Sequence, residues 1–399
     1  MKILFRLNTM CILVLVLTAC SNSTTSTNIA TLPASTTISQ PPTRSMTTAP
    51  LMDPTSPPPT AALQTSLTVL KGHSAPVTNV VWSPNGQFLA TSAGSFHPSA
   101  IDATIRLWRA DGTLIKILSG HSAPVVGLAW SADSQILASG SDDAIRLWRA
   151  DGTLIATLHS AGDIQKLAWS PDSQTLASAI TSSLGPVVQL WQRDGTPLAQ
   201  LSTQNSGGKF FNLAWSPDGQ FLLGGTIDYK VWRANGTEVF HLKKCSTCTP
   251  AWGMTWSPDS KLWAIGDEGG NVDVYDIEGD ATAHLQNTKG NADALAWSPN
   301  GQILAGGDGV NLWKMDGSLQ VTHASFGRVN SLAWSPDGQL LASGSSGNGL
   351  RLWNADGQLL AAFPGEVSKV AWSPDGQQLA VASDNTIQLW QVRLTLPRP

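Results

Sequence analysis

Short apolar runs alternate with polar turns along most of this chain. Residues 125–130, 136–139, 144–148 and 154–158 show the pattern clearly: each run is rich in branched or aromatic side chains, and the turns between them are rich in Ser, Asp and Gly. Runs of this length and composition predict β-strands. An Asp-Gly or Asn-Gly pair between the third and fourth runs recurs in six places, and we expect it to form a type I′ turn that joins antiparallel neighbours.

Two aromatic marks repeat through the same region. A Trp-Ser-Pro-(Asp/Asn)-(Gly/Ser) motif, or a one-residue variant of it, occurs eight times at intervals of 37 to 48 residues. This interval is typical of architectures that repeat a unit of four strands. The first mark begins at Trp82, Trp130, Trp169, Trp215, Trp256, Trp297, Trp334 and Trp372, and the second lies at Trp108, Trp148, Trp191, Trp232, Tyr275, Trp313, Trp353 and Trp390.

The repeat predicts an all-β fold, a β-propeller of eight four-stranded blades. A four-stranded sheet with two apolar faces cannot bury both alone, so the units must stack face to face, and a twisted stack of this kind closes into a ring. The last unit has only three strands before the chain ends, whereas residues 66–70 supply an extra strand at the other end. We therefore expect the N-terminal strand to pair with the C-terminal blade. A seven-bladed ring with one stray unit is the alternative.

The units resemble those of the WD-repeat family. The resemblance is carried by Gly72-His73 and Gly120-His121 before the first strand, by "LASGS" at 137–141, and by "IRLW" or "IQLW" on the third strand. It extends over residues 67–392, although Trp-Arg, Trp-Gln, Trp-Lys or Trp-Asn replaces the Trp-Asp pair that names the family.

The resemblance implies a buried hydrogen-bonded set in each complete blade, made of His, Ser or Thr, Asp and Trp. Because buried polar groups need partners, such a set is structural rather than catalytic. His159 and His323 lie at a comparable distance before a repeat tryptophan, whereas units four, five and eight lack the His. The implied members are His73, Thr91, Asp102 and Trp108 in unit one, and His121, Ser139, Asp142 and Trp148 in unit two.

The N-terminus carries a targeting signal. Lys2 and Arg6 precede an apolar stretch that ends in Leu-Thr-Ala-Cys at Cys20, and the stretch is too short for a stable transmembrane helix. Leu-Thr-Ala-Cys resembles the bacterial lipobox, which implies cleavage after Ala19 and lipidation of Cys20. Two or more acyl chains anchor a protein stably, because each buried methylene contributes about 0.8 kcal/mol. An ordinary secretory signal with an incidental cysteine is the alternative.

The next segment is rich in Ser, Thr and Pro and lacks apolar periodicity, so it cannot bury enough surface to offset its ordering entropy. We interpret it as a disordered tether. The predicted organisation is a lipoprotein signal peptide (1–19), the tether (20–65), the propeller (66–393) and a C-terminal tail (394–399). The location expected is the outer face of the cytoplasmic membrane, or the outer membrane if the cell has one.

Composition and motifs do not point to catalysis. The chain has 28 acidic and 24 basic residues and a net charge of −4, which argues against nucleic-acid binding. There is no Gly-x-Ser-x-Gly elbow, His-Glu-x-x-His motif or phosphate loop. We therefore predict no enzyme activity, catalytic residue or cofactor.

The other cysteines of interest are Cys245 and Cys248, for which a local disulfide is predicted outside the cytoplasm. Redox catalysis is an alternative, as is an incomplete zinc site with His241. The acidic stretch at 267–273 is interpreted as a polar turn rather than a calcium loop. We predict no metal site.

Four insertions interrupt the repeat, at 93–100, 179–187, 202–209 and 243–252. All lie in connections that open on the same face of a propeller, and repeat proteins tend to place variable insertions on the binding face. Phe96, His97, Lys243 and Trp252 mark the expected partner-binding face. The predicted function is a monomeric, membrane-anchored scaffold for an unknown protein partner. A role like that of propeller lipoproteins in outer-membrane barrel assembly is one alternative, and a propeller hydrolase or lyase is another.

Overall fold

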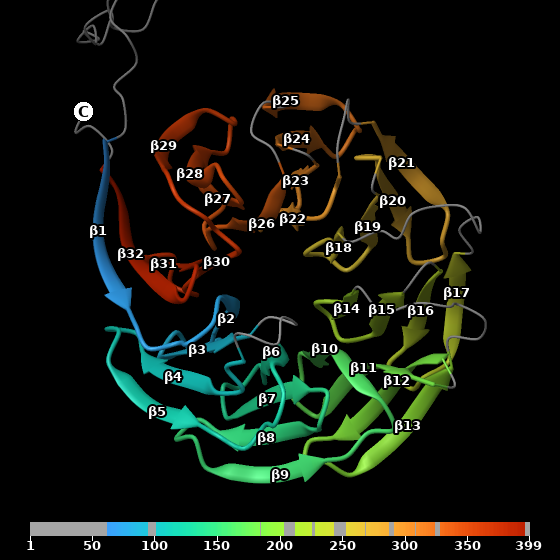
Figure 1. The fold of residues 1–399 in the computed structure, drawn as a ribbon. Coiled ribbons are helices and arrows are strands. Elements are labelled where there is room, and N and C mark those ends of the chain that lie inside the picture. The colour runs from blue at the N-terminus through green and yellow to red at the C-terminus, as the bar shows by residue number, and fades with distance from the viewer. Residues whose placement is uncertain are drawn as a thin grey trace, which may run out of the picture. The chain divides into compact units, whose positions relative to one another are not determined.

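The computed structural model describes residues 62–94, 101–183, 185–202, 212–225, 228–242, 253–267, 269–286, 291–307, 309–323 and 328–395. These residues form eight four-stranded antiparallel sheets arranged around a central channel (Figure 1). The all-β, eight-bladed prediction is therefore confirmed. Within the described ranges, no helix has the length and apolar character needed to cross a bilayer.

The strands of each blade are designated a to d from the channel outward. The first blade comprises β2 (Val77–Trp82), β3 (Phe88–Ala93), β4 (Ile105–Arg109) and β5 (Leu114–Leu118). The second comprises β6 (Val125–Trp130), β7 (Ile136–Ser141), β8 (Ile145–Arg149) and β9 (Leu154–Leu158). The third comprises β10 (Asp163–Trp169), β11 (Thr175–Ser182), β12 (Gly185–Gln192) and β13 (Pro197–Ser202). The fourth comprises β14 (Asn212–Trp215), β15 (Phe221–Gly225), β16 (Tyr229–Arg233) and β17 (Glu238–Leu242).

The second half of the ring follows the same plan. The fifth blade comprises β18 (Gly253–Trp256), β19 (Leu262–Gly266), β20 (Val272–Asp276) and β21 (Ala281–Leu285). The sixth comprises β22 (Leu295–Trp297), β23 (Ile303–Gly306), β24 (Val310–Lys314) and β25 (Leu319–His323). The seventh comprises β26 (Val329–Trp334), β27 (Leu340–Ser345), β28 (Gly349–Asn354) and β29 (Leu359–Phe363). The eighth comprises β30 (Lys369–Trp372), β31 (Gln378–Ser383), β32 (Thr386–Thr395) and β1 (Ala62–Leu70).

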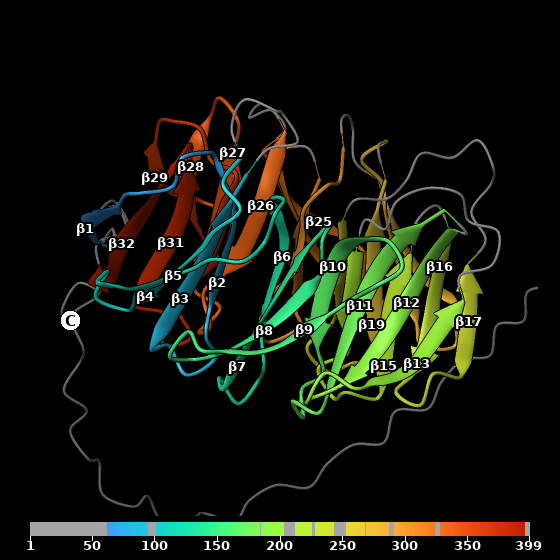
Figure 2. The same cartoon turned by 60° about the horizontal axis from the view of Figure 1, so that its bottom comes forward.

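The eighth blade closes the ring as predicted. β1 pairs antiparallel with β32 from Ala62 opposite Thr395 to Leu70 opposite Ile387, and it lies beside β32 at the outer edge in both views (Figures 1 and 2). The strand starts four residues before the predicted Ser66. The two ends of the described chain therefore share one sheet, which joins the blades into a closed ring.

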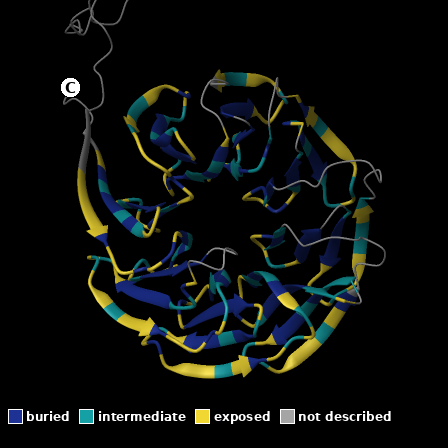
Figure 3. Ribbon diagram, viewed as in Figure 1, coloured by how far each residue is buried: buried dark blue, intermediate teal, exposed yellow. Residues whose placement is uncertain are grey.

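Burial follows the strand order within each blade. The b and c strands are mostly buried, whereas the d strands expose much of their length around the rim (Figure 3). The apolar clusters contain side chains of neighbouring blades, because each blade packs its faces against the next. Stacking therefore buries the surface that a single sheet would leave exposed.

The strand-a tryptophans link neighbouring blades. In five blades the indole N–H donates to the carbonyl of the alanine that precedes the tryptophan of the previous blade, at 3.1–3.2 Å. The bond from Trp82 to Ala371 joins the first blade to the eighth. The repeated aromatic mark thus contributes hydrogen bonds between blades as well as apolar area.

The turns between strands c and d differ from the prediction. In the first blade, the Gly112 N–H donates to the Arg109 carbonyl at 2.9 Å, and the Arg109 N–H donates to the Thr113 carbonyl at 2.8 Å. Gly112 has a φ of +88°, whereas Asp111 is not among the described residues with positive φ. The type I′ prediction is wrong: this is a three-residue loop with a glycine bulge. The Asp111 carboxylate stabilises it by accepting the Thr113 N–H at 2.8 Å.

Three of the turns between strands a and b have serine where the others have glycine. Ser134, Ser173 and Ser260 have φ angles of 62–63°, which cost energy for a residue with a Cβ. Each hydroxyl accepts the backbone N–H of the Asn or Asp in the preceding blade's turn at 3.0 Å. These hydrogen bonds between blades offset the energetic cost of the positive φ angles.

The fifth blade replaces the strand-c tryptophan by Tyr275. The neighbouring Trp263 is fully buried and stacks on Tyr275, with ring centroids 4.6 Å apart. The Trp263 indole donates to the Asp276 carbonyl at 2.7 Å. Burial raises the pKa of Tyr275 to about 12, with a further contribution from Asp273. Trp263 lies outside the two repeat marks and supplies the aromatic volume that this blade would otherwise lack.

Candidate interaction face

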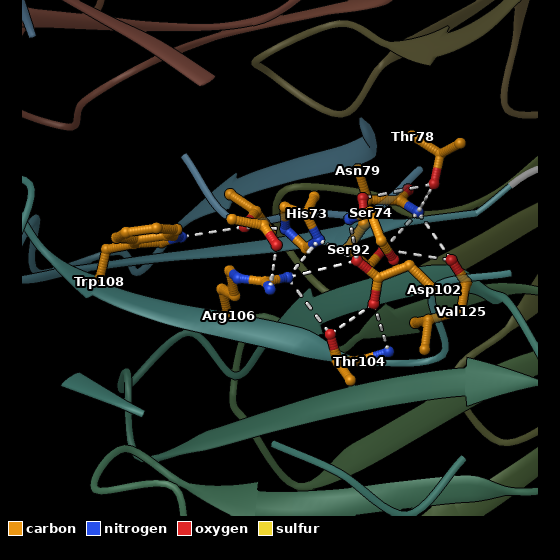
Figure 4. Close-up of polar contacts among 12 residues, drawn as sticks. His73, Ser74, Thr78, Asn79, Ser92, Asp102, Thr104, Arg106, Trp108 and Val125 are labelled. Carbon is orange, nitrogen blue, oxygen red and sulfur yellow. Dashed lines mark hydrogen bonds and ion pairs between the residues drawn. The ribbon is translucent and has the colours of Figure 1, made fainter. Parts of the chain in front are cut away.

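The first blade contains the hydrogen-bonded set that its sequence implied (Figure 4). His73 Nδ1 lies 2.9 Å from Asp102 Oδ2, and His73 Nε2 lies 2.9 Å from the Thr91 hydroxyl. The Trp108 indole donates to the same hydroxyl at 3.0 Å. Asp102 also accepts the backbone N–H groups of Ser74 and Thr104 at 3.0 Å. The set therefore connects the segment before strand a with strands b and c.

Arg106 is a fifth member that sequence reasoning missed. Its Nη1 lies 3.3 Å from Asp102 Oδ2 and 2.7 Å from His73 Nδ1, and its Nη2 donates to the Gly72 carbonyl (Figure 4). Burial raises the pKa of Asp102, but hydrogen bonds from His73, Thr104 and Ser74 outweigh it and hold the pKa well below its ordinary value. The signal was present in the sequence, because Arg106 and Arg146 both lie two residues before the strand-c tryptophan.

The second blade repeats the set with one correction. His121 contacts Asp143 at 2.7 Å, not the predicted Asp142, and it contacts Ser139 at 2.8 Å. Asp142 is exposed, whereas Asp143 is partly buried beside strand c. The conformation of the b–c turn determines which of the two adjacent acids contacts His121. The spacing of residues in the sequence does not determine it. The Trp148 indole donates to Ser139 at 2.8 Å.

Arg146 has the same place in the second blade as Arg106 in the first. It donates to Asp143 at 2.8 Å. Burial raises the pKa of Asp143, but the hydrogen bonds from His121 and Arg146 have the larger effect and lower the pKa to about 2. Burial lowers the pKa of His121, only partly opposed by Asp143. The imidazole is therefore neutral and the carboxylate ionised at neutral pH.

In the third and fourth blades, the described residues form only part of the set. In the third blade Ser178 accepts from Trp191 at 2.9 Å, but His159 is exposed. In the fourth blade the residue that corresponds to Arg106 is Lys230, which donates to Glu238 on strand d at 2.7 Å. These contacts link the strands within the third and fourth blades.

The two faces of the ring differ in regularity. The turns between strands a and b lie on one face, and all eight contain the same hydrogen bond from the serine of the first mark to the Asn or Asp two residues later, at 2.5–2.7 Å. The connections between strands b and c, and from strand d to the next strand a, lie on the opposite face. We call this second surface the variable face, because the described insertion at 179–187 lies on it; the other three predicted insertions fall largely outside the described residues.

The insertion at 179–187 is an extension of the third blade. β11 and β12 pair over eight positions, from Thr175 opposite Gln192 to Ser182 opposite Gly185. In the first and second blades, strands b and c pair over five. Strand a follows the extension, since Asp163 pairs with Thr181, and strand d follows it too, since Ser202 pairs with Val187. The third blade therefore has three more b–c pairs at the variable face than the first two blades.

Several predicted residues lie outside the described residues. These are Cys20, Phe96, His97, Lys243, Cys245, Cys248 and Trp252. His241, the third member of the alternative zinc site, lies on β17 with its Nε2 3.5 Å from Asp228 Oδ2. Within the described part of the chain, no three His, Cys, Asp or Glu side chains form a group that could hold a metal ion. In the acidic segment, Asp267 accepts the Asn271 N–H at 2.8 Å, and Glu268 lies outside the described residues.

Closed eight-bladed geometry and the His–Ser/Thr–Asp–Trp sets define this protein as a WD-repeat β-propeller. Comparison with known families agrees with this class. The family described as "IFT122 first beta-propeller" matches residues 93–325, and the chain belongs to it. The family described as "WD domain, G-beta repeat" matches residues 64–109, 317–354 and 357–391.

Solved structures with the same fold include Sqt1 from Chaetomium thermophilum. One crystal structure is 19% identical in sequence, with a TM-score of 0.71, and covers 81% of this chain and 97% of Sqt1. A second has a TM-score of 0.72 at 19% identity and covers 84% and 100%. In a third, Sqt1 is bound to the N-terminus of the ribosomal protein L10; its TM-score is 0.70 at 19% identity, with 82% and 98% covered. Comparison with curated proteins finds no match.

Proposed function

We propose that this protein is a non-enzymatic interaction platform that binds a protein partner through its variable face. The observation that carries the proposal is the difference between the two faces. One face repeats the same turn and the same serine hydrogen bond in all eight blades, whereas the other carries the extended third blade. Variable connections on a rigid scaffold are the usual place for binding residues. The Sqt1 complex with a ribosomal protein segment provides a precedent for this type of fold.

We further propose that a lipid on Cys20 holds the protein on the outer side of a membrane. The Leu-Thr-Ala-Cys motif supports this, together with the Ser-, Thr- and Pro-rich segment that follows it. Such a segment would let the propeller reach a partner at a distance from the membrane surface. Cys20→Ala should release the protein from the membrane fraction. Cys11→Ala is the matched control, because it removes a cysteine from the segment expected to be cleaved off, and it should leave the protein in that fraction.

The binding face can be tested by shortening the third blade. Residues 180–187 would be replaced by Ser-Asp-Asp-Ala, the corresponding b–c connection of the second blade. Crosslinking in intact cells, with a photoreactive residue on the variable face, should capture a defined partner that is lost on shortening. The same residue placed on the opposite face is the control. A captured set that stays unchanged after shortening, and after deletion of the other three insertions, would falsify the binding-face proposal.

A further inference from the structure

One position of the repeat lines the central channel at the variable face. This position lies three residues before each strand-a tryptophan, and in five consecutive blades its residue lines a cavity of about 150 Å³. Such a volume is about that of five water molecules in the liquid, so the cavity has room for a side chain but not for a folded element. The residues at this position are Asn212, Gly253, Ala294, Ser331 and Lys369.

Two lysines occupy this position. Lys369 of the eighth blade lines the cavity, and Lys166 has the same place in the third blade. Neither ammonium group forms an ion pair or a hydrogen bond with the residues that the structure describes. Desolvation by the surrounding strands lowers the pKa of both, and the charge of Lys369 helps to lower that of Lys166 to about 8. Lys166 is half-buried and Lys369 is exposed, so an anion from solvent can reach Lys369, and its charge would offset the repulsion between the two cations.

Asp293 and Arg328 add two further charges to the same mouth of the channel. Asp293 also lines the cavity, and its Oδ2 accepts from Arg328 Nε at 2.5 Å. Its Oδ1 is buried and has no hydrogen-bond partner among the described residues. The cavity wall therefore offers the Lys369 ammonium group for an anion and a carboxylate oxygen of Asp293 that needs a donor, and Lys166 occupies the same repeat position across the ring.

We propose that the channel mouth binds an acidic segment of the protein partner, with a Glu or Asp carboxylate held by Lys369 and Lys166. A peptide fits this wall better than inorganic phosphate, because a peptide brings N–H donors for Asp293 along with its carboxylate. The inference rests on the proposed function, since it names the chemistry of the partner that the variable face binds.

The test measures the binding of a fluorescein-labelled hexaglutamate peptide to the full chain by fluorescence anisotropy. The wild-type protein should bind hexaglutamate and not the neutral hexaglutamine. Lys369→Gln and Lys166→Gln should each weaken binding about tenfold, the usual effect of losing one charge-assisted hydrogen bond. Lys369→Arg keeps the charge and should retain most of the affinity.

Lys261→Gln provides the control for net charge. Lys261 lies in an a–b turn on the opposite face, and its side chain is 80% exposed, so this change should leave the affinity unaltered. Unchanged tryptophan emission in every variant would show that the ring is intact. Lack of hexaglutamate binding by the wild-type protein would overturn the proposal, as would equal weakening by Lys261→Gln. Competition by inorganic phosphate at equal concentration would reassign the ligand from a peptide to a phosphate.

Failure of this inference can be told apart from failure of the proposed function. The lysine substitutions leave every connection of the variable face intact, and shortening the third blade leaves both lysines in place. If crosslinked capture depends on the insertions while hexaglutamate binding does not depend on the lysines, the platform stands and only the acidic-segment assignment falls.

Discussion

Replacing Leu70 by alanine should destabilise the propeller about as much as the same change at Leu118. Both leucines end the outer strand of their blade, and both are almost completely buried, with 3% and 2% of their surface exposed. Each lies over the turn glycine of the next blade: the Cδ2 of Leu70 is 2.8 Å from where a Cβ on Gly112 would be, and that of Leu118 is 2.7 Å from the Cβ position of Gly152. The two sites are therefore equivalent in packing.

The expected cost follows from this packing. Truncating a fully buried leucine to alanine costs about 2–5 kcal/mol, because transfer energy is lost and a cavity remains. Leu70 also belongs to the apolar cluster that joins the eighth blade to the first. Val69→Ala is the matched control, since Val69 is the neighbouring residue of the same strand and 42% exposed. It should change the stability by about 0.5 kcal/mol or less.

Urea unfolding followed by tryptophan emission would measure all three variants. Leu70→Ala and Leu118→Ala should lower the unfolding midpoint by similar amounts, and Val69→Ala should leave it close to that of the wild-type protein. A large shift for Leu118→Ala with no shift for Leu70→Ala would mean that β1 does not act as the outer strand of the eighth blade. Equal shifts for Leu70→Ala and Val69→Ala would contradict the burial of Leu70 and the exposure of Val69.

Three further changes test other parts of the structure. Ser134→Ala keeps the strained φ but loses the hydrogen bond from Asn85, so its urea midpoint should fall below that of Ser134→Gly, which relieves the strain; the reverse order would contradict the account of these turns. The pKa of Asp143 falls from 3.8 to about 2 on folding, so its contribution, on the order of 2 kcal/mol, is present above pH 4 and lost as the pH falls towards 2. The lowered pKa of His121 acts in the same direction below pH 6.5. Asp143→Asn should therefore flatten the dependence of the urea midpoint on pH between 4 and 2, and an unchanged slope would refute the assignment. Lys166→Ala should leave the urea midpoint unchanged or raise it, and a clear loss of stability would show that the lysine is needed for folding.

The repeated parts of the fold could be predicted from the sequence because each depends on contacts that recur in every unit. The count of strands required an eighth outer strand, and β1 supplies it. The blade-one set was also predicted, since His73, Thr91, Asp102 and Trp108 stand at the family's positions. The choice between two adjacent acids was not, because the conformation of the b–c turn decides which carboxylate reaches His121. The same limit applies to the c–d turns, where the Asp111 side chain stabilises a bulged loop that the Asp-Gly pair alone does not specify.

The two channel lysines, Lys166 and Lys369, could not be predicted for a different reason. The sequence prediction rests on residues that the repeat units share, and these lysines occur in only two units. At the position three residues before the strand-a tryptophan, Gly253 and Ala294 show that a small side chain satisfies the fold. A lysine there adds no ion pair or hydrogen bond with the described residues, and Lys166 loses hydration, as its lowered pKa indicates. Packing therefore does not explain two lysines at one repeat position around the same channel. Positions where the fold accepts glycine and the chain nonetheless places a costly charge are where a propeller can acquire binding chemistry without disturbing its blades.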